Sequence, residues 1–100
     1  MERAHVEFDR FFDVVMETDE AQVAEMTLQP GRETGGPENY HADSDQWLFV
    51  VSGAGTVTVD GEDHSVAAGD VMRIDAGERH AVANDGEEPL ETLNVYTPPR

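Results

Sequence analysis

The sequence predicts an all-β fold, a barrel or sandwich built from short antiparallel strands. Three observations favour this class: apolar and polar residues alternate over short segments, turn residues separate the segments, and no long helical pattern interrupts them. Successive side chains of a strand point to opposite faces, so this alternation is typical of strands with one buried face. About eight to ten such strands are expected, as in small β-sandwiches and barrels.

The chain has 100 residues, the size of one domain. We expect a single domain over residues 1–100, with its core at about residues 20–97 and a short N-terminal extension before it. The apolar residues of this extension have the spacing of one or two helical turns: Phe8, Phe11, Phe12 and Val15. Residues 13–17 fit a strand equally well, so both alternatives stay open. The phenylalanines are expected to cover one end of the core or to contact another subunit.

Beyond the extension, strands are expected at residues 22–28, 38–41, 46–51, 56–60, 63–67, 71–75, 79–83 and 90–96. Gly, Pro, Asn and Asp separate them, and these residues favour turns. Asp60-Gly61 is a strong hairpin signal, because a type I′ turn needs positive φ at both central positions. Residues 52–55 are expected to form another turn. The strands therefore follow one another through short connections.

The charge of the chain is extreme. It contains 22 acidic and six basic residues, all six of them arginine, and its formal net charge is −16. Such a charge destabilises the compact state by self-repulsion, which salt screens. We infer that the protein comes from a salt-accumulating organism, an ordinary acidic protein being the alternative. Nucleic acids and acidic membrane surfaces are excluded as partners, because both are bound through clustered Lys and Arg.

Other features of the composition bear on the compartment. No apolar run reaches the roughly 18 residues that a membrane-spanning helix needs. The N-terminus lacks the basic and apolar regions of a secretory signal. The absence of cysteine excludes disulfides and thiolate metal sites. A cytoplasmic protein is therefore expected.

Two segments combine histidines with regularly spaced glycines. The first contains Asn39, His41, Gln46 and Gly53, and the second contains Gly69, Asp75, Gly77, His80 and Asn84. Their spacing resembles the two motifs of the cupin superfamily, G-x5-H-x-H-x3–4-E-x6-G and G-x5-P-x-G-x2-H-x3-N. The second motif is matched closely, with Asp75 in the proline position. The resemblance implies a single-domain cupin β-barrel, a double-stranded jelly roll.

The first motif departs from the family pattern at three positions, one of them the leading glycine, which is displaced to Gly35 or Gly36. Asn39 stands in place of the first histidine and Gln46 in place of the glutamate. Metal-binding family members typically use three histidines and one glutamate, so the resemblance implies the set Asn39, His41, Gln46 and His80 here. Two imidazoles and two amide oxygens can hold a divalent transition metal, Zn, Fe, Mn or Ni, with less charge compensation than a set containing a carboxylate. Both a bound metal and a metal-free site stay open.

Two functions follow from this resemblance. One is a divalent-metal-dependent enzyme, such as a dioxygenase, isomerase or decarboxylase, acting on a small molecule. The other is a non-catalytic, sensor-type barrel that binds a small ligand without metal. The retained histidines favour the enzyme, and the amides favour the binding module. In either case we expect the ligand pocket to be lined by Leu48, Met72 and Val82.

The alternation of the predicted strand at residues 46–51 also has consequences for assembly. If Gln46 faces the interior, then Trp47, Phe49 and Val51 face outward. An apolar outer face of a sheet needs cover. We expect a homodimer, with packing against the N-terminal segment as the alternative. Arg73 is expected to pair with nearby carboxylates rather than to steer an acidic substrate.

Overall fold

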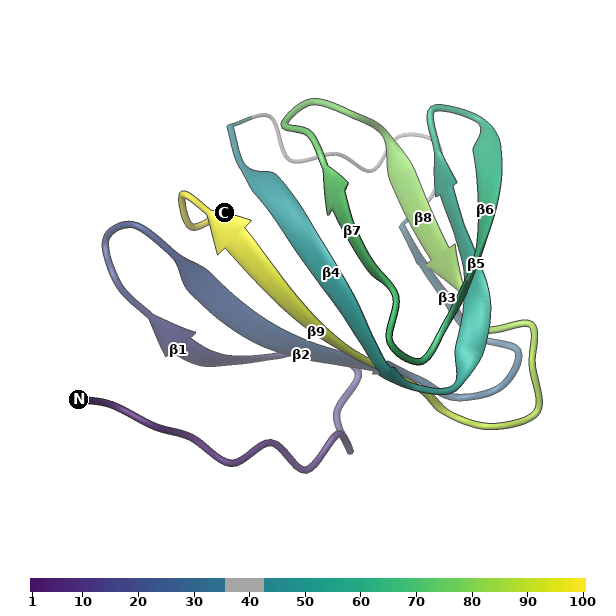
Figure 1. Ribbon diagram of the computed structural model, residues 1–100, viewed down its shortest axis with the longest axis horizontal. Helices are drawn as coiled ribbons and strands as arrows, with labels where there is room; N and C mark the ends of the chain where they lie inside the picture. The colour runs from purple at the N-terminus through teal and green to yellow at the C-terminus, as the bar shows by residue number, and fades with distance from the viewer. Residues whose placement is uncertain (36–42) are drawn as a thin grey trace.

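The computed structural model describes residues 1–35 and 43–100, and strands dominate this part of the chain. The strands are β1 (Asp13–Glu17), β2 (Gln22–Leu28), β3 (Glu33–Gly35), β4 (Asp45–Ser52), β5 (Ala54–Val59), β6 (Glu62–Ala67), β7 (Val71–Ile74), β8 (His80–Ala83) and β9 (Leu90–Thr97). Figure 1 shows their arrangement. No helix of the described residues is long and apolar enough to span a membrane. The all-β fold class is confirmed.

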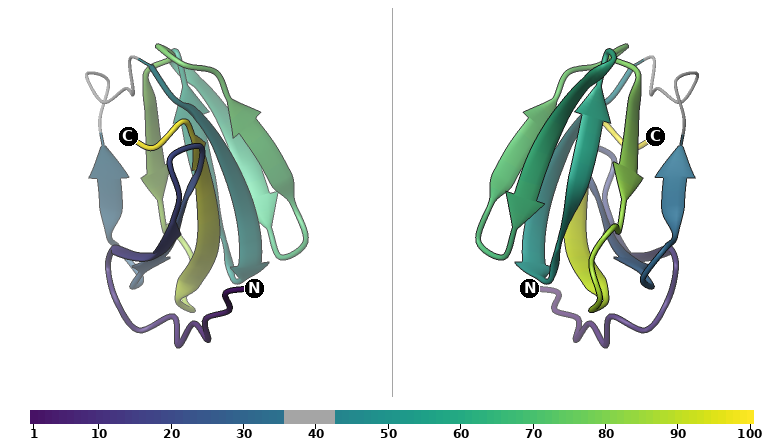
Figure 2. Two further views of the ribbon diagram at one scale, coloured as in Figure 1. Left: turned by 90° about the vertical axis from the view of Figure 1, so that its left-hand side faces the viewer. Right: turned by 90° about the vertical axis from the view of Figure 1, so that its right-hand side faces the viewer.

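The strands form two antiparallel sheets. One sheet has the order β1-β2-β9-β4-β7 and the other has the order β3-β8-β5-β6. Figures 1 and 2 show the two sheets facing each other as two layers. Strands that follow one another in sequence lie in different sheets, except for the pairs β1–β2 and β5–β6, which are neighbours within one sheet. This alternation makes the fold the double-stranded β-helix of the jelly-roll type.

The N-terminal extension contains a strand where a helix was the alternative. Residues 13–17 pair with β2 in antiparallel register, with Asp13 opposite Glu25 and Glu17 opposite Gln22. The amide of Thr27 continues this pairing by donating to the carbonyl of Arg10. The exposed edge of β2 offers backbone groups that need partners, and the extension supplies them.

Most predicted strands are found within two residues of their expected ends. Asp60 and Gly61 have φ values of 47° and 83°, as the predicted hairpin turn requires. The predicted turn at residues 52–55 is wrong in its extent, because β5 already begins at Ala54. Gly55 lies inside that strand, where a Cβ would collide with the carbonyl of Ala83 and the side chain of Leu90. The predicted strand at residues 38–41 lies outside the described residues.

The hydrophobic core lies between the two sheets. Its buried members are Met26, Leu28, Leu48, Val50, Val57, Val66, Ile74, Val82 and Leu90. They come from alternate positions of their strands, which is the pattern that a pleated sheet with one buried face produces. Polar residues continue the same interior faces: Gln46 on β4 and Thr92 and Asn94 on β9 are also buried. The barrel interior is therefore apolar in one part and polar in another.

The acidic side chains lie almost entirely at the surface. Glu25 is the only buried carboxylate of the described residues. In the same part of the chain only Arg73 forms an ion pair between arginine and carboxylate, with Asp75 and Asp45. Most carboxylates thus repel one another without a compensating cation.

We therefore expect the protein to be stabilised strongly by salt. Raising KCl from about 0.1 M to about 2 M shortens the Debye length from about 10 Å to below about 3 Å and removes most of the repulsion. The melting temperature should rise by about 10 °C or more, which corresponds to about 2 kcal/mol for a domain of this size. Scanning calorimetry at several KCl concentrations measures this, and an unchanged melting temperature would contradict it.

Candidate functional site

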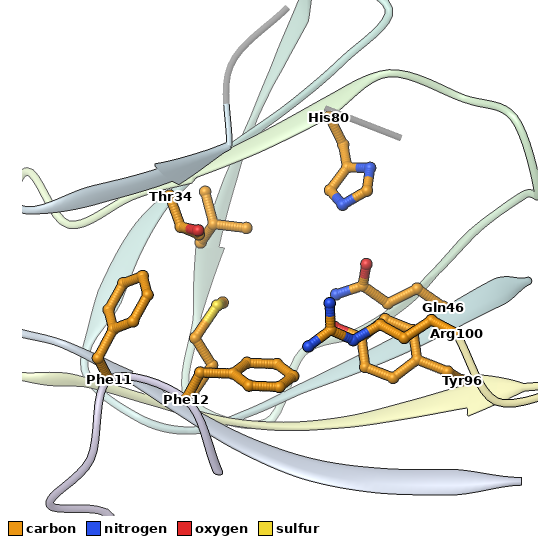
Figure 3. Close-up of a pocket in the computed structure, with 9 residues that line it drawn as sticks. Phe11, Phe12, Thr34, Gln46, His80, Tyr96 and Arg100 are labelled. Atoms are coloured by element: carbon orange, nitrogen blue, oxygen red, sulfur yellow. The ribbon is translucent and has the colours of Figure 1, made fainter. Parts of the chain in front are cut away.

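A pocket of about 260 Å³ lies between the two sheets at the side where the N-terminal extension and the C-terminal segment meet (Figure 3). It is lined by Phe11, Phe12, Met26, Thr34, Gln46, His80, Val82, Tyr96 and Arg100. Gln46 enters from β4 of one sheet and His80 from β8 of the other. The volume is somewhat below the 300–1,000 Å³ typical of drug-sized ligands, so the pocket fits a smaller molecule.

The structure brings together two of the four residues that the sequence suggests as metal ligands. Gln46 and His80 both line the pocket, and Figure 3 shows both side chains pointing into it. Asn39 and His41 lie outside the described residues. Of the residues expected to line a ligand pocket, Val82 lines this one. Leu48 belongs to the apolar core instead, and Met72 packs against it. Leu48 lies two residues beyond Gln46 on β4, and Met72 lies opposite Leu48 on β7.

A chain of hydrogen bonds fixes the orientation of the Gln46 carboxamide. The Thr92 hydroxyl donates to the backbone carbonyl of Met26 (2.7 Å), so it accepts from Nδ2 of Asn94 (3.0 Å). Asn94 Oδ1 then faces Gln46 and accepts from Gln46 Nε2 (2.9 Å). A carbonyl can only accept, and this sets the direction of every bond in the chain. Consequently Gln46 Oε1, and not its NH₂ group, is directed to the pocket.

The Gln46 oxygen is buried and lacks a hydrogen-bond donor within residues 1–35 and 43–100. The side chain as a whole is only 2% exposed. Leaving such an oxygen unsatisfied costs about 1–3 kcal/mol. Figure 3 shows this oxygen on the side of the carboxamide that faces the His80 ring. A bound cation or a donor group of a ligand would satisfy it.

The position of the proton on the His80 ring follows from a hydrogen bond of its own. Its Nδ1 lies 3.3 Å from the carbonyl oxygen of Glu78. Since that oxygen can only accept, Nδ1 carries the proton and Nε2 carries the lone pair. Burial lowers the pKa of His80 below its ordinary value of 6.5, although the carbonyl and the charge of Glu78 act in the opposite direction. At neutral pH the ring is therefore a neutral imidazole, the form that binds metals.

These two donors fit a divalent transition metal. An imidazole nitrogen and an amide oxygen are both ligands that such ions accept, and the Nδ1 hydrogen bond of His80 is the usual support of a metal-binding histidine. The described residues contain no group of three His, Asp or Glu side chains placed to hold a metal.

Comparison with known protein families agrees with the observed fold. The cupin domain family model (Cupin_2) matches residues 24–96, most of the chain. The chain belongs to the cupin family. The match includes both Gln46 and His80, and it spans every strand from β2 to β9 except the first two residues of β2 and the last residue of β9.

Three relatives illustrate what this cupin is similar to. An oxalate-binding protein of Thermotoga maritima is 35% identical over 72% of this chain and 58% of its own length. A solved structure from Bacillus halodurans is 30% identical, with a TM-score of 0.86 over 94% of this chain and 76% of that one. A sugar phosphate isomerase of Silicibacter pomeroyi is 28% identical, with a TM-score of 0.70 over 78% of this chain and 50% of that one.

The chain is shorter than the curated proteins that it matches. It spans 18% of a mannose-1-phosphate guanylyltransferase from Klebsiella pneumoniae and 58% of the oxalate-binding protein. These relatives differ in activity, so the similarity establishes the domain and its family.

Sequence reasoning missed the polar and aromatic residues that complete the pocket of this cupin. Tyr96 belongs to a strand with strict alternation, in which Leu90, Thr92, Asn94 and Tyr96 are all buried. That alternation is visible in the sequence and indicates an interior face with two polar residues. Burial raises the pKa of the Tyr96 hydroxyl above its ordinary value of 10.0, although the charge of Arg100 lowers it, so the hydroxyl stays protonated at neutral pH.

The outer face of β4 is apolar and exposed, as the alternation of the strand predicts. Trp47, Phe49 and Val51 are all exposed, and Val71 of the neighbouring strand β7 lies opposite Phe49 and is 66% exposed. Arg73 lies opposite Trp47, with its guanidinium 5.7 Å from the ring centre, and pairs with Asp75 at 3.2 Å. The prediction that Arg73 is paired is confirmed. A homodimer formed through this face stays a prediction.

Proposed function

We propose that this cupin binds a small molecule in the pocket between its sheets, with a divalent transition metal held by His80 and Gln46. One observation carries the proposal: the buried Gln46 oxygen is directed into the pocket by the Asn94–Thr92 chain without a donor in the described residues. Such an arrangement keeps a lone pair available beside the His80 imidazole.

The relatives support the small-molecule part of the proposal. One of them binds oxalate and another is a sugar phosphate isomerase, so binding and catalysis both occur on this fold. A divalent ion would supply polarisation of a carbonyl or carboxylate oxygen of the ligand. The protein's own contribution is to orient the ligand, exclude water with Phe11 and Phe12, and keep the Tyr96 hydroxyl protonated beside it.

A second candidate function is metal-free binding of a ligand. It is favoured by the lack of any group of three His, Asp or Glu side chains placed to hold a metal within residues 1–35 and 43–100. In this case a hydroxyl or amine of the ligand would donate to Gln46 Oε1. The two candidates share this oxygen and differ in the group that satisfies it.

The metal content of the purified protein separates these candidates. We expect about one transition-metal equivalent per chain in the wild type, and loss of this metal in His80→Ala. Gln46→Leu removes the amide oxygen and keeps a buried side chain at the same position, so it should lower metal affinity by roughly tenfold or more. Elemental analysis and competition with a chelator measure both effects.

The surface histidine His64 provides the control. It lies on the exposed strand β6, so His64→Ala should retain the metal. Equal metal loss in the His64 and His80 variants would contradict the proposal. A wild-type protein that stays metal-free in the presence of added Zn, Mn, Fe and Ni would leave metal-free binding as the function.

A further inference from the structure

The charge of the pocket differs from that of the rest of the molecule. The chain as a whole carries a formal charge of −16, with 22 acidic residues. Yet within residues 1–35 and 43–100 the pocket is lined by no acidic residue, and one of the lining residues, Arg100, is a cation. In a chain with so many carboxylates, described walls that contain an arginine and no carboxylate have the composition of an anion site.

Arg100 is held in this position by two aromatic rings. Its guanidinium carbon lies 4.1 Å from the centre of the Phe12 ring and 5.2 Å from the centre of the Tyr96 ring. Phe12 and Tyr96 are themselves in contact, with ring centres 6.5 Å apart. Figure 3 shows the guanidinium beside Tyr96. The two rings form a shelf that orients the planar cation and leaves its N–H groups for other partners.

The arginines of this chain differ in how their charge is compensated. Arg73 forms ion pairs with Asp75 and Asp45. Arg100 forms no ion pair with any carboxylate of the described residues. The other four arginines form no ion pair within the described residues either, so Arg100 is distinguished by its place in the pocket wall, where its N–H groups can reach a ligand.

The other polar side chains that line the pocket in the described part of the chain add no negative charge. An imidazole and an amide carry none, so neither His80 nor Gln46 compensates Arg100. An anionic ligand would compensate this cation. A carboxylate matches the guanidinium best, because both are planar and can form two parallel hydrogen bonds. The volume of about 260 Å³ restricts the ligand to a small molecule.

We infer that the pocket is specific for a small carboxylate, and that Arg100, held on the Phe12–Tyr96 shelf, is the residue that recognises its charge. This inference rests on the proposed function, because it assigns a ligand class to the same pocket. It assigns Arg100 a binding role that is separate from the lone-pair donors His80 and Gln46.

Matched pairs of carboxylates and neutral carboxamides test the inference. We would titrate malonate against malonamide, lactate against lactamide and benzoate against benzamide by calorimetry, using the protein as purified at one fixed KCl concentration. Inorganic phosphate serves as an anion of different shape. At least one carboxylate should bind the wild type at least tenfold more tightly than its amide and than phosphate.

Three variants test whether Arg100 is the cause of the preference for carboxylates. Arg100→Gln should weaken the preferred carboxylate by tenfold or more, and Arg100→Lys should recover part of this loss, because it keeps the charge without the planar fork. Arg3→Gln makes the same change of charge at an exposed residue away from the pocket and should leave the affinity unchanged. Circular dichroism and the metal content of each variant verify that the fold and the His80–Gln46 donors are retained.

The results that would overturn the carboxylate inference differ from those that would overturn the proposed function. Equal binding of carboxylates and amides, preference for phosphate, or unchanged affinity in Arg100→Gln would overturn the carboxylate inference while the proposed function stands. If no probe of either charge binds to wild-type protein that holds its metal, the inference is also overturned. If His80→Ala neither loses metal nor changes the affinity of any probe, the proposed function itself fails.

Discussion

Gly53→Ala is expected to reduce the free energy of unfolding by about 3 kcal/mol or more. Gly53 has a φ of +89° and lies between β4 and β5, where the chain crosses from one sheet to the other. A Cβ at this position would lie less than 3.0 Å from the carbonyl oxygen of Pro89. Since that atom belongs to the backbone, it cannot move aside as a flexible side chain would. The free-energy cost of the left-handed backbone and the cost of the collision therefore add.

Gly69→Ala provides the matched control for this prediction. Gly69 has a similar φ of +96°, but a Cβ there would meet nothing within 4 Å. Its substitution should cost only the backbone contribution, about 1–2 kcal/mol. Urea unfolding of the two variants separates the collision from the backbone strain. Equal losses in both variants would show that the approach of Pro89 to Gly53 does not matter.

Asn94→Leu is expected to affect both stability and binding. Asn94 is fully buried and connects Gln46 to Thr92, so leucine at this position leaves Gln46 Nε2 without its acceptor. The unsatisfied amide should cost about 1–3 kcal/mol. The carboxamide also loses the bond that directs its oxygen to the pocket. We therefore expect metal affinity to fall by about 10- to 100-fold, the range typical of lost support for a ligand.

A pair of isosteric substitutions tests whether the hydrogen-bond chain from Thr92 to Gln46 is the cause of the expected losses in stability and metal affinity. Thr92→Val removes the hydroxyl at the end of the chain and should weaken both stability and metal affinity. Thr27→Val removes a similarly buried hydroxyl that has no hydrogen-bond partner among the described residues, so it should be neutral or stabilising. Chelator competition and urea unfolding measure the pair. If metal affinity is unchanged in both Thr92→Val and Asn94→Leu, the hydrogen-bond chain does not direct the Gln46 oxygen to the pocket.

The fold was predictable from the sequence because its signals are local. Alternation along residues 46–51 and 90–96 indicates which side chains face the interior, and Asp60-Gly61 defines a hairpin by its backbone conformation alone. The spacing from Gly69 to Asn84 indicated the family. Gly55 was misinterpreted as a turn residue, since its role depends on the backbone of Ala83, which is distant in sequence.

The site was predictable only in part, for a physical reason. The motifs suggested Gln46 and His80, and both line the pocket. No local pattern indicates that Arg100 lies over Phe12 and Tyr96, because this contact joins the two ends of the chain. Nor does the sequence reveal which way the Gln46 carboxamide points. That orientation follows from bonds to Asn94 and Thr92, which only the paired strands bring together.

Nitrogen-15 NMR of the imidazole rings during titration with Zn²⁺ tests the central claim most directly. The account predicts that His80 Nε2 shifts at stoichiometric metal, while Nδ1 remains protonated and bonded to the Glu78 carbonyl. It also predicts that Asn94→Leu needs about 10- to 100-fold more free metal to produce the same shift. A titration that moves only the resonances of His5 and His64, and leaves His80 unchanged, would contradict the assignment of this pocket as the binding site.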